Sequence, residues 1–201
     1  AIVQDRYGPP DEVLDLREVE IPDPGPDEVR VRVRAASVHP DIWHVVTGYP
    51  RLLRLMGAGL RRPKQPIPGT DMAGDVEAVG ADVTRFAIGD KVFGETHRQI
   101  QWVNGGAYAE FACAPEDVLS AVPEGLTYEQ AATVPTSGMI AVNNLRDQIG
   151  SRPGQRILIN GAAGGVGSIA IQMAKARGAF VVGVDHTGKL DFMRALGADE
   201  A

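Results

Sequence analysis

The sequence predicts an α/β protein in two parts: a domain of short strands and turns over residues 1–122, and a domain of alternating strands and helices over residues 123–201. Three observations lead to this prediction. Valine alternates with arginine over Val29–Arg34, and a period of two is typical of a half-buried strand. In the second part, the apolar runs Arg156–Asn160 and Phe180–Val184 are typical of parallel strands buried on both faces. A glycine-rich turn and a helical pattern separate these runs, which completes a β-α-β order.

The other elements of the first part follow from its turn residues and apolar patterns. A helix is expected over Asp41–Thr47, ended by Gly48, and the basic, leucine-rich stretch Arg51–Leu60 is expected to form a surface helix or a lid. Further strands are expected at Met72–Gly80, Lys91–Gly94 and Tyr108–Ala114.

The second part is predicted to hold four helices. Thr127 is a suitable N-cap for the first helix, and Gly178 and Gly197 follow the last two as C-cap glycines. The third helix is expected to bury one face, formed by Ile169, Ala170, Met173 and Ala174. The four helices are expected over Tyr128–Thr133, Ser137–Ile149, Val166–Arg177 and Lys189–Leu196.

Composition excludes several classes of protein. The formal net charge of −6 argues against a nucleic-acid partner, which would require a basic surface. No apolar run approaches the roughly 20 residues of a membrane span, so no membrane partner is expected. The first residues do not resemble a signal peptide, and the single cysteine, Cys113, allows no intrachain disulfide. A cytoplasmic location is therefore expected.

The glycine-rich turn lies between a predicted strand and a predicted helix, which is the context that a dinucleotide-binding fingerprint requires. Against G-x-G-x-x-G, the second and third glycines match at Gly164 and Gly167, and Ala162 stands at the first position. Gly164 is expected to let the backbone approach a pyrophosphate, and Gly167 to let the helix pack closely on the strand. The alternative is a turn with only a folding role. We expect a nicotinamide dinucleotide to bind at Gly161, Ala162, Ala163, Gly164, Gly165, Val166 and Gly167.

Asp185 is predicted to end the second apolar strand, where a carboxylate commonly holds the hydroxyls of the adenosine ribose. A negative charge there favours NAD over NADP, because it repels a 2′-phosphate. However, His186, Thr187 and Lys189 follow at once and are suited to binding a phosphate. A structural role for Asp185 near a helix N-terminus is the alternative. The sequence therefore predicts NAD(P)H with no preference between the two forms.

Seven stretches of the chain carry a resemblance to a known family. They are Ala1–Pro10, Arg34–Trp43, Pro68–Gly80, Phe86–Phe93, Gly105–Phe111, Ala131–Gly138 and Asn160–Gly167. In their order and spacing they resemble the zinc-independent, quinone oxidoreductase-like branch of the medium-chain dehydrogenase/reductase superfamily. The resemblance implies a GroES-like β-barrel domain followed by a Rossmann dinucleotide-binding domain, of which the chain holds only the N-terminal part.

The resemblance also implies where substrate and cofactor bind. The segment His39–Trp43 corresponds to one that lines the cleft beside the nicotinamide, so His39, Asp41, Trp43 and Tyr49 are candidate catalytic residues. Most relatives have asparagine in place of His39, and this histidine is either a proton donor or a packed residue. Trp43 either stacks on a flat substrate or packs in the core, and Tyr49 is a further proton donor. Thr136 is expected near the cofactor, with a role as a helix N-cap as the alternative.

A catalytic zinc is not expected. In the zinc-using branch, the segment equivalent to Ser37–Asp41 carries a cysteine ligand, and the segment equivalent to Gly69–Asp71 reads Gly-His-Glu. Both segments lack the required residue here, and His39, His44 and His97 do not have the spacing of metal ligands.

The expected function is transfer of a hydride from NAD(P)H to a quinone, an enone or a related carbonyl substrate without zinc. A zinc-free alcohol or aldehyde reductase and a non-catalytic NAD(P)H-binding protein are the alternatives. Because members of the family are much longer, we expect this chain to be truncated and inactive or unstable alone, with an unpaired sheet edge. A complete protein is expected to form a homodimer.

Overall fold

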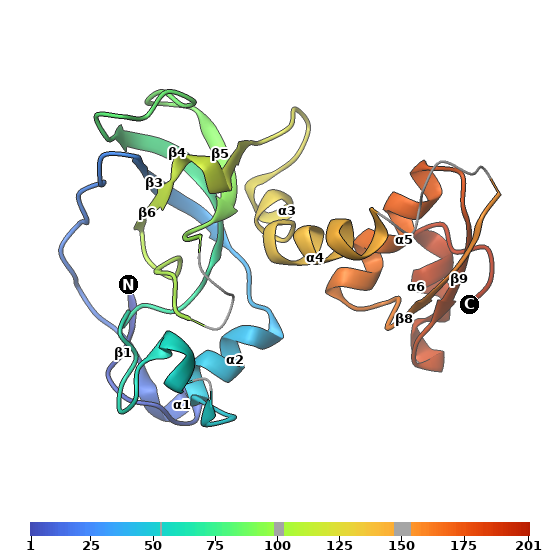
Figure 1. Cartoon of the computed structure of the whole chain (residues 1–201), viewed down its shortest axis with the longest axis horizontal. Helices are drawn as coiled ribbons and strands as arrows, with labels where there is room; N and C mark the ends of the chain where they lie inside the picture. Colours follow the sequence, from blue (N-terminus) through green and yellow to red (C-terminus); the bar gives the residue numbers. More distant parts are fainter. Residues whose placement is uncertain (53, 99–102, 147–153) are drawn as a thin grey trace. The chain divides into compact units, whose positions relative to one another are not determined.

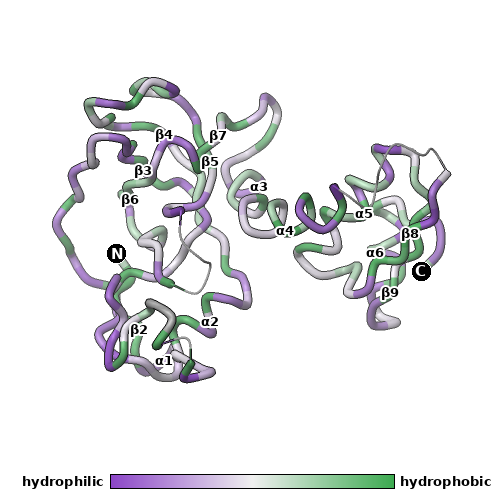
Figure 2. Tube along the Cα trace, in the orientation of Figure 1, coloured by the Kyte–Doolittle hydropathy of each residue, from purple (hydrophilic) through white to green (hydrophobic). Residues whose placement is uncertain are grey.

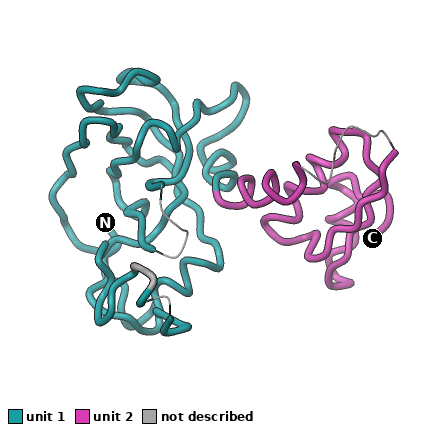
Figure 3. Tube along the Cα trace, in the orientation of Figure 1, with its two compact units in different colours: residues 1–135 teal, residues 136–201 magenta. Residues whose placement is uncertain are grey.

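The computed structural model describes residues 1–52, 54–98, 103–146 and 154–201. The chain forms two compact units, Ala1–Pro135 and Thr136–Ala201 (Figure 3). The sequence led us to expect a boundary at residue 122, but helix α3 (Tyr128–Ala132) packs with the first unit, where Ala131 and Ala132 are buried against the sheet. Contact with the sheet, rather than the change in sequence pattern, therefore sets the extent of this unit.

The first unit is built on a five-stranded antiparallel sheet with the strand order β6-β3-β4-β5-β7 (Figure 1). The predicted alternation is confirmed in β3, where Val29 and Val31 are completely buried while the alternating arginines, Arg30, Arg32 and Arg34, are not. Met72, Val76, Val92 and Leu119 from the other strands complete this core. The strands span Glu28–Ala36 (β3), Asp71–Val79 (β4), Lys91–Glu95 (β5), Phe111–Pro115 (β6) and Leu119–Ala121 (β7).

Shorter elements surround this sheet. Strands β1 (Ile2–Gln4) and β2 (Leu14–Leu16) form a separate antiparallel pair, with helix α1 (Pro10–Val13) between them. Helix α2 (Pro40–Thr47) ends, as predicted, at Gly48, which is left-handed with φ 61°. Instead of a surface α-helix over Arg51–Leu60, the chain forms one π-helical turn, Arg54–Ala58, and Leu53 lies outside the described residues. A short 3-10 turn, Glu116–Val118, precedes β7.

The second unit contains the predicted β-α-β order. Strand β8 (Arg156–Asn160) pairs in parallel with β9 (Phe180–Val184), and helix α5 (Gly165–Ala176) connects them. Both strands belong to strongly hydrophobic stretches of the chain (Figure 2). Helix α4 (Pro135–Leu145) precedes them, and a 3-10 turn (Thr187–Lys189) and helix α6 (Leu190–Ala195) follow.

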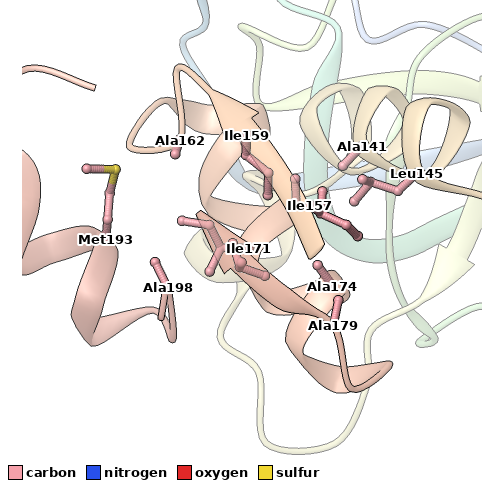
Figure 4. Packing of buried hydrophobic residues seen from close by; sticks show 12 residues of the cluster. Ala141, Leu145, Ile157, Ile159, Ala162, Ile171, Ala174, Ala179, Met193 and Ala198 are labelled. Atoms are coloured by element: carbon pink, nitrogen blue, oxygen red, sulfur yellow. The ribbon is translucent and has the colours of Figure 1, made fainter. Parts of the chain in front are cut away.

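The core of the second unit lies between the two strands and their helices (Figure 4). Ile171 and Ala174 of α5 are completely buried, together with Val181 and Met193. The predicted inner face of α5 is corrected in part, because Ile169 and Met173 are only partly buried while Ile171 lies at the centre. Ile171 is covered as well as Ala170 and Ala174 because α5 packs against both β8 and β9.

Two predicted starts, of one strand and one helix, differ by two or more residues from the structure. The strand expected from Tyr108 begins at Phe111, because the N–H of Tyr108 bonds the carbonyl of Pro68 instead of a neighbouring strand. Helix α4 begins at Pro135 rather than Ser137, so Thr136 lies inside its first turn and is not an N-cap. The predicted end at Ile149 lies outside the described residues.

The described helices were also compared with the dimensions of a lipid bilayer. None of them is both long enough and apolar enough to span a membrane.

Candidate functional site

The glycine turn is fixed to the ends of both parallel strands. Strand β8 ends at Asn160, and Gly161 turns the chain with φ 71°, a conformation that favours glycine. The N–H groups of Gly161 and Ala162 both donate to the carbonyl of Val184 at the end of β9, at 2.9 and 3.1 Å. The turn is therefore held at the carboxyl ends of the strands, where open parallel sheets bind ligands.

The two matching glycines of the fingerprint have different surroundings. A Cβ on Gly167 would lie 2.2 Å from the carbonyl oxygen of Gly161, so only glycine permits helix α5 to start this close to the turn. A Cβ on Gly164 would meet one heavy atom among the described residues within 4 Å, the Gly161 oxygen at 3.3 Å. Gly167 thus serves packing, whereas the space in front of Gly164 is open.

A hollow of about 740 Å³ lies beside the turn within the second unit. It is lined by Gly161 and Gly164–Gly167, by residues of β8, and by Ala141, Asn144 and Leu145 of α4. In the first turn of α5, the first helical hydrogen bond runs from the N–H of Ser168 to the carbonyl of Gly164, at 2.9 Å. The N–H groups of Gly165, Val166 and Gly167 precede this bond, and such groups give a helix start its affinity for anions.

Asp185 follows β9 directly, one residue beyond the predicted strand end, and reaches back to the glycine turn. Its carboxylate accepts hydrogen bonds from the N–H of His186 at 2.7 Å and from the N–H of Ala163 at 3.0 Å. These two bonds, in this order of importance, hold the pKa of Asp185 below its usual value. The carboxylate is therefore a fixed negative charge beside the turn.

The candidate phosphate-binding residues lie next to this carboxylate. Lys189 Nζ is 3.6 Å from an Asp185 oxygen, and His186 Nδ1 accepts a hydrogen bond from the N–H of Gly188 at 3.1 Å. Thr187 begins the 3-10 turn that joins the two residues. The structure thus gathers Asp185, His186, Thr187 and Lys189 at one edge of the glycine turn, with both signs of charge represented.

The hydroxyl of α4 that approaches the turn is not the one that the sequence singled out. Thr136 is 3% exposed inside helix α4. Its neighbour Ser137 lies against the turn instead, since its Oγ would be 3.0 Å from a Cβ on Gly165. Helical periodicity explains the difference, because adjacent residues on a helix point about 100° apart, and the helix start cannot be located to one residue from sequence.

A second cluster lies in the first unit around His39. His39 is the N-cap residue of α2, and Pro40 occupies the first helical position. The imidazole makes no capping bond. Instead its Nε2 lies 3.0 Å from Thr70 Oγ1, and the Thr70 hydroxyl donates to Asp71 Oδ1 at 2.8 Å. Asp41, in the first turn of α2, approaches the other ring nitrogen, with Oδ2 3.7 Å from His39 Nδ1.

Burial distinguishes the members of this His39 cluster. Thr70 and Asp71 are each 1% exposed, whereas the side chains of His39 and Asp41 are 11% and 23% exposed. Backbone bonds hold Thr70 and Asp71 at the start of β4, from the N–H of Thr96 to Thr70 O and from the N–H of Ser37 to Asp71 O. The cluster therefore has a rigid, buried side and a side nearer to solvent.

The other two catalytic candidates are exposed. Trp43 is 49% exposed and packs edge-to-face with His44, with ring centroids 5.1 Å apart. The alternative of core packing for Trp43 is therefore wrong. Tyr49 is 62% exposed, and its carbonyl accepts a hydrogen bond from His44 Nδ1 at 2.8 Å. Both residues are accessible to a ligand in this unit.

Sequence reasoning missed the role of Thr70 and Asp71. Both residues were noted only because their segment lacks a zinc ligand. The signal was nevertheless present, since two segments that provide ligands to one metal in relatives must be adjacent in space. The corresponding segments around His39 and Thr70 accordingly meet here.

Within the described ranges, no group of three or more histidine, cysteine, aspartate and glutamate side chains is arranged to hold a metal ion. Cys113 lies on β6, with Sγ 3.7 Å from the carbonyl of Pro22. Burial, followed by the nearby carboxylate of Glu28, raises the pKa of its thiol to about 11 and disfavours the thiolate that binds metals.

Comparison with known proteins identifies relatives of both units. Residues 25–124 match the alcohol dehydrogenase GroES-like domain. The chain is 36% identical to a chloroplastic quinone-oxidoreductase homolog of Spinacia oleracea, over 100% of the chain and 59% of that protein. It is 34% identical to 2-methylene-furan-3-one reductase of Solanum lycopersicum, over 97% of the chain and 49% of that protein.

A solved structure extends the similarity to three dimensions. The quinone oxidoreductase of Escherichia coli, complexed with NADPH, superposes with a TM-score of 0.80 at 30% identity, over 99% of this chain and 56% of that one. The chain thus spans between about half and three fifths of the length of these relatives. The match to the GroES-like domain and the relatives of both units agree, and the chain belongs to the quinone oxidoreductase-like branch of the medium-chain dehydrogenase/reductase superfamily.

Proposed function

We propose that this protein is an NAD(P)H-dependent oxidoreductase that transfers a hydride to a quinone or an enone without zinc. The observation that carries the proposal is the space in front of Gly164, where a Cβ would meet one described atom at 3.3 Å, next to the N–H groups that precede the first helical hydrogen bond of α5. A turn with only a folding role needs Gly167, where a Cβ would lie 2.2 Å from a backbone oxygen, but it does not need glycine as strictly at position 164. A phosphate group that approaches the backbone does.

The residues around the turn fit a dinucleotide. The N–H groups of Gly165–Gly167 are suited to the pyrophosphate, and Ser137 adds a hydroxyl beside them. Asp185 is suited to the ribose hydroxyls, and Lys189 to a 2′-phosphate. The bound nicotinamide supplies the hydride, and the protein supplies orientation and electrostatics.

The His39 cluster is proposed to serve the substrate. His39 is suited to exchanging a proton, because it lies between two carboxylates and its Nδ1 has no hydrogen-bond partner among the described residues. Asp41 is proposed to stabilise the imidazolium form. Trp43 offers an exposed aromatic face for a flat substrate, and Tyr49 offers a further hydroxyl.

Chemistry without zinc is supported by the residues of the same cluster. At the two segments that carry ligands in zinc-using relatives, this chain has His39 and the pair Thr70-Asp71, with no thiol. His39 Nε2 is directed to the Thr70 hydroxyl, so this nitrogen is not available to a metal. A conjugated carbonyl compound is a better hydride acceptor than a simple ketone, so its carbonyl group needs less polarisation. Such a substrate fits a site that has no Lewis acid.

The names of relatives support the substrate class. The Escherichia coli protein is called a quinone oxidoreductase and the spinach protein a quinone-oxidoreductase homolog. The tomato protein is called a reductase of 2-methylene-furan-3-one, a ketone conjugated to a carbon–carbon double bond. Both substrate types accept a hydride at an electron-poor conjugated system. We propose the same class for this protein.

The test is oxidation of NADPH and NADH by the purified full-length protein with a simple quinone, an open-chain enone and an aliphatic aldehyde in parallel. Turnover of the quinone or the enone above that of the aldehyde is expected. Preferred turnover of the aldehyde would replace the proposal by an alcohol or aldehyde reductase. Tight cofactor binding with no turnover of any acceptor would replace it by a non-catalytic NAD(P)H-binding protein.

Two further properties are proposed from the family resemblance. The complete protein is proposed to be a homodimer, which sedimentation velocity tests against the mass of one chain. It is also proposed to act in the cytoplasm, which fractionation of the source cells tests.

A further inference from the structure

The direction of one hydrogen bond determines where His39 carries its proton. Thr70 Oγ1 donates to Asp71 Oδ1 at 2.8 Å, and a hydroxyl has only one hydrogen to donate. At its contact with His39 Nε2, 3.0 Å away, Thr70 Oγ1 must therefore be the acceptor. The hydrogen of this bond belongs to the imidazole, so Nε2 is protonated.

The other ring nitrogen is then the one with a free lone pair. His39 Nδ1 is buried from water and has no hydrogen-bond partner among the residues that the structure describes. The nearest charged group, Asp41 Oδ2 at 3.7 Å, is beyond the range of a hydrogen bond. A buried polar nitrogen without a partner is unusual in a folded protein, and its lone pair is available to a group that binds beside it.

We propose that Thr70 and Asp71 are positioning residues that keep the proton of neutral His39 on Nε2, so that Nδ1 is the atom that exchanges a proton with the substrate. This inference rests on the proposed function and adds to it the identity of the reacting nitrogen. The opposite tautomer is disfavoured because it directs a lone pair of Nε2 at the Thr70 hydroxyl, whose only hydrogen is bound to Asp71.

The proton balance of the step follows. A proton from solvent reaches Nδ1 of neutral His39 by way of Asp41, whose side chain is 23% exposed, and His39 becomes an imidazolium between Asp41, at 3.7 Å from Nδ1, and Asp71, at 3.8 Å from Nε2. When the substrate accepts a hydride from the cofactor, its two electrons leave an oxygen negatively charged. The Nδ1–H bond breaks and an O–H bond forms on that oxygen. His39 returns to the neutral form, with its remaining proton on Nε2.

The tautomer can be measured without any turnover. The chain has four histidines, and imidazole ¹⁵N chemical shifts distinguish a protonated from an unprotonated ring nitrogen. The His39→Asn variant identifies the His39 signals by their loss. We expect Nε2 of neutral His39 to be protonated and Nδ1 to be unprotonated. A protonated Nδ1 in the neutral form would overturn the proposal.

The positioning role is tested with Thr70→Val, which keeps the shape of the side chain and removes the hydroxyl. We expect the ¹⁵N shifts of His39 to move toward those of a mixture of tautomers, and Thr70→Ser to restore the wild-type shifts. His186 is an internal control, because its Nδ1 accepts from Gly188 in the other unit and its signals should not move. Unchanged His39 shifts in Thr70→Val would contradict the role of Thr70.

Turnover then tests the catalytic part. General acid catalysis contributes about 10²–10⁴-fold to a rate, so His39→Asn should lower kcat by about a hundredfold or more with little change in KM. Thr70→Val should lower kcat by about tenfold, within the same range, and Thr70→Ser should recover it. Thr133→Val is the matched control, because Thr133 is exposed and its hydroxyl donates to the carbonyl of Gln130, within the same helix end.

The outcomes separate this inference from the proposed function. If the wild type shows the expected tautomer but His39→Asn turns over normally, Nδ1 is excluded as the proton donor. The oxidoreductase proposal then stands. The expected tautomer with no turnover of any acceptor by the wild type would exclude the oxidoreductase and the proton-donor role together, and would leave the positioning role of Thr70 established by the ¹⁵N shifts.

Discussion

Asp185 and Ala163 lie in different segments of the second unit, and the carboxylate of Asp185 accepts a hydrogen bond from the N–H of Ala163 at 3.0 Å. This bond joins the end of β9 to the glycine turn that follows β8. It gives one side chain two roles, since Asp185 stabilises the turn and also sets the charge at the proposed ribose site.

The first prediction concerns acid stability. Backbone N–H groups lower the pKa of Asp185 in the folded state. Its ionised form therefore stabilises the fold fully at pH values above the ordinary aspartate pKa of about 3.9, and this stabilisation is lost as the pH falls through the lower folded-state pKa. Asp185→Asn should therefore unfold at lower urea concentration than the wild type at pH 7. The difference should shrink as the pH falls below about 4. A difference that stays constant over this range would contradict the assignment.

The second prediction concerns the choice of cofactor. Asp185→Asn should favour NADPH, because it removes a charge that repels a 2′-phosphate, and Lys189→Met should favour NADH. Charges about 4 Å apart in water interact by about 1 kcal/mol, which corresponds to about a fivefold change in affinity. The measurement is the ratio of dissociation constants for NADH and NADPH, from quenching of protein fluorescence. The NADH/NADPH ratio of dissociation constants must shift in opposite directions in the two variants. The same ratio in both variants would show that a 2′-phosphate does not bind at this edge.

The third prediction compares two glycines of the turn. Gly167→Ala places a Cβ 2.2 Å from a backbone oxygen and should destabilise the protein by at least about 2 kcal/mol. Gly164→Ala meets only a 3.3 Å contact, so it should fold with nearly normal stability and lose cofactor affinity. Urea unfolding and cofactor titration of both variants separate folding from binding. Normal cofactor affinity in a folded Gly164→Ala protein would disprove the proposed pyrophosphate site.

The fourth prediction concerns alkaline pH. The Tyr128 hydroxyl donates to Asp75 on β4, and burial, followed by this bond, raises the pKa of Tyr128 to about 12. A raised pKa means that the contribution of Tyr128 is fully present below the ordinary value of about 10 and is lost as the pH rises through about 12. Tyr128→Phe should cost about 1 kcal/mol near neutral pH.

The measurements for this prediction are urea unfolding and the absorbance of phenolate. One tyrosine signal that titrates at high pH should disappear in Tyr128→Phe. A second such signal should persist from Tyr108, whose pKa is also raised to about 12, chiefly by burial. Tyr49→Phe is the control, since Tyr49 is 62% exposed. Equal stability of Tyr128→Phe and the wild type would show that the bond to Asp75 does not hold α3 on the sheet.

Much of the architecture follows from local patterns in the sequence. Alternation of valine and arginine identified β3, apolar runs identified β8 and β9, and Gly48, Gly178 and Gly197 marked chain turns that require positive φ. Thr127 also caps α3 as predicted, with Gln130 completing a capping box. These features depend on neighbours along the chain, and such neighbours are visible in the sequence.

The boundaries of elements, and which of two adjacent residues faces a site, could not be predicted from the sequence. Thr136 and Ser137 differ by one position, and only the start of α4 at Pro135 decides that Ser137 faces the turn. Trp43 is suited by type to either a core or a surface, and its exposure depends on what packs against α2. A pattern along the chain does not contain this information, because it depends on residues from other elements.

By itself, the sequence determined the α/β class, the β-α-β unit with its glycine turn, and the family to which the chain belongs. Only the tertiary structure showed that Asp185 bonds Ala163, and that His39 meets Thr70 and Asp71 with one ring nitrogen left without a partner. The physical reason is the range of the interactions. Turns and strands are set by backbone geometry within a few residues, whereas a hydrogen bond between residues 39 and 70 exists only after the sheet has brought their segments together.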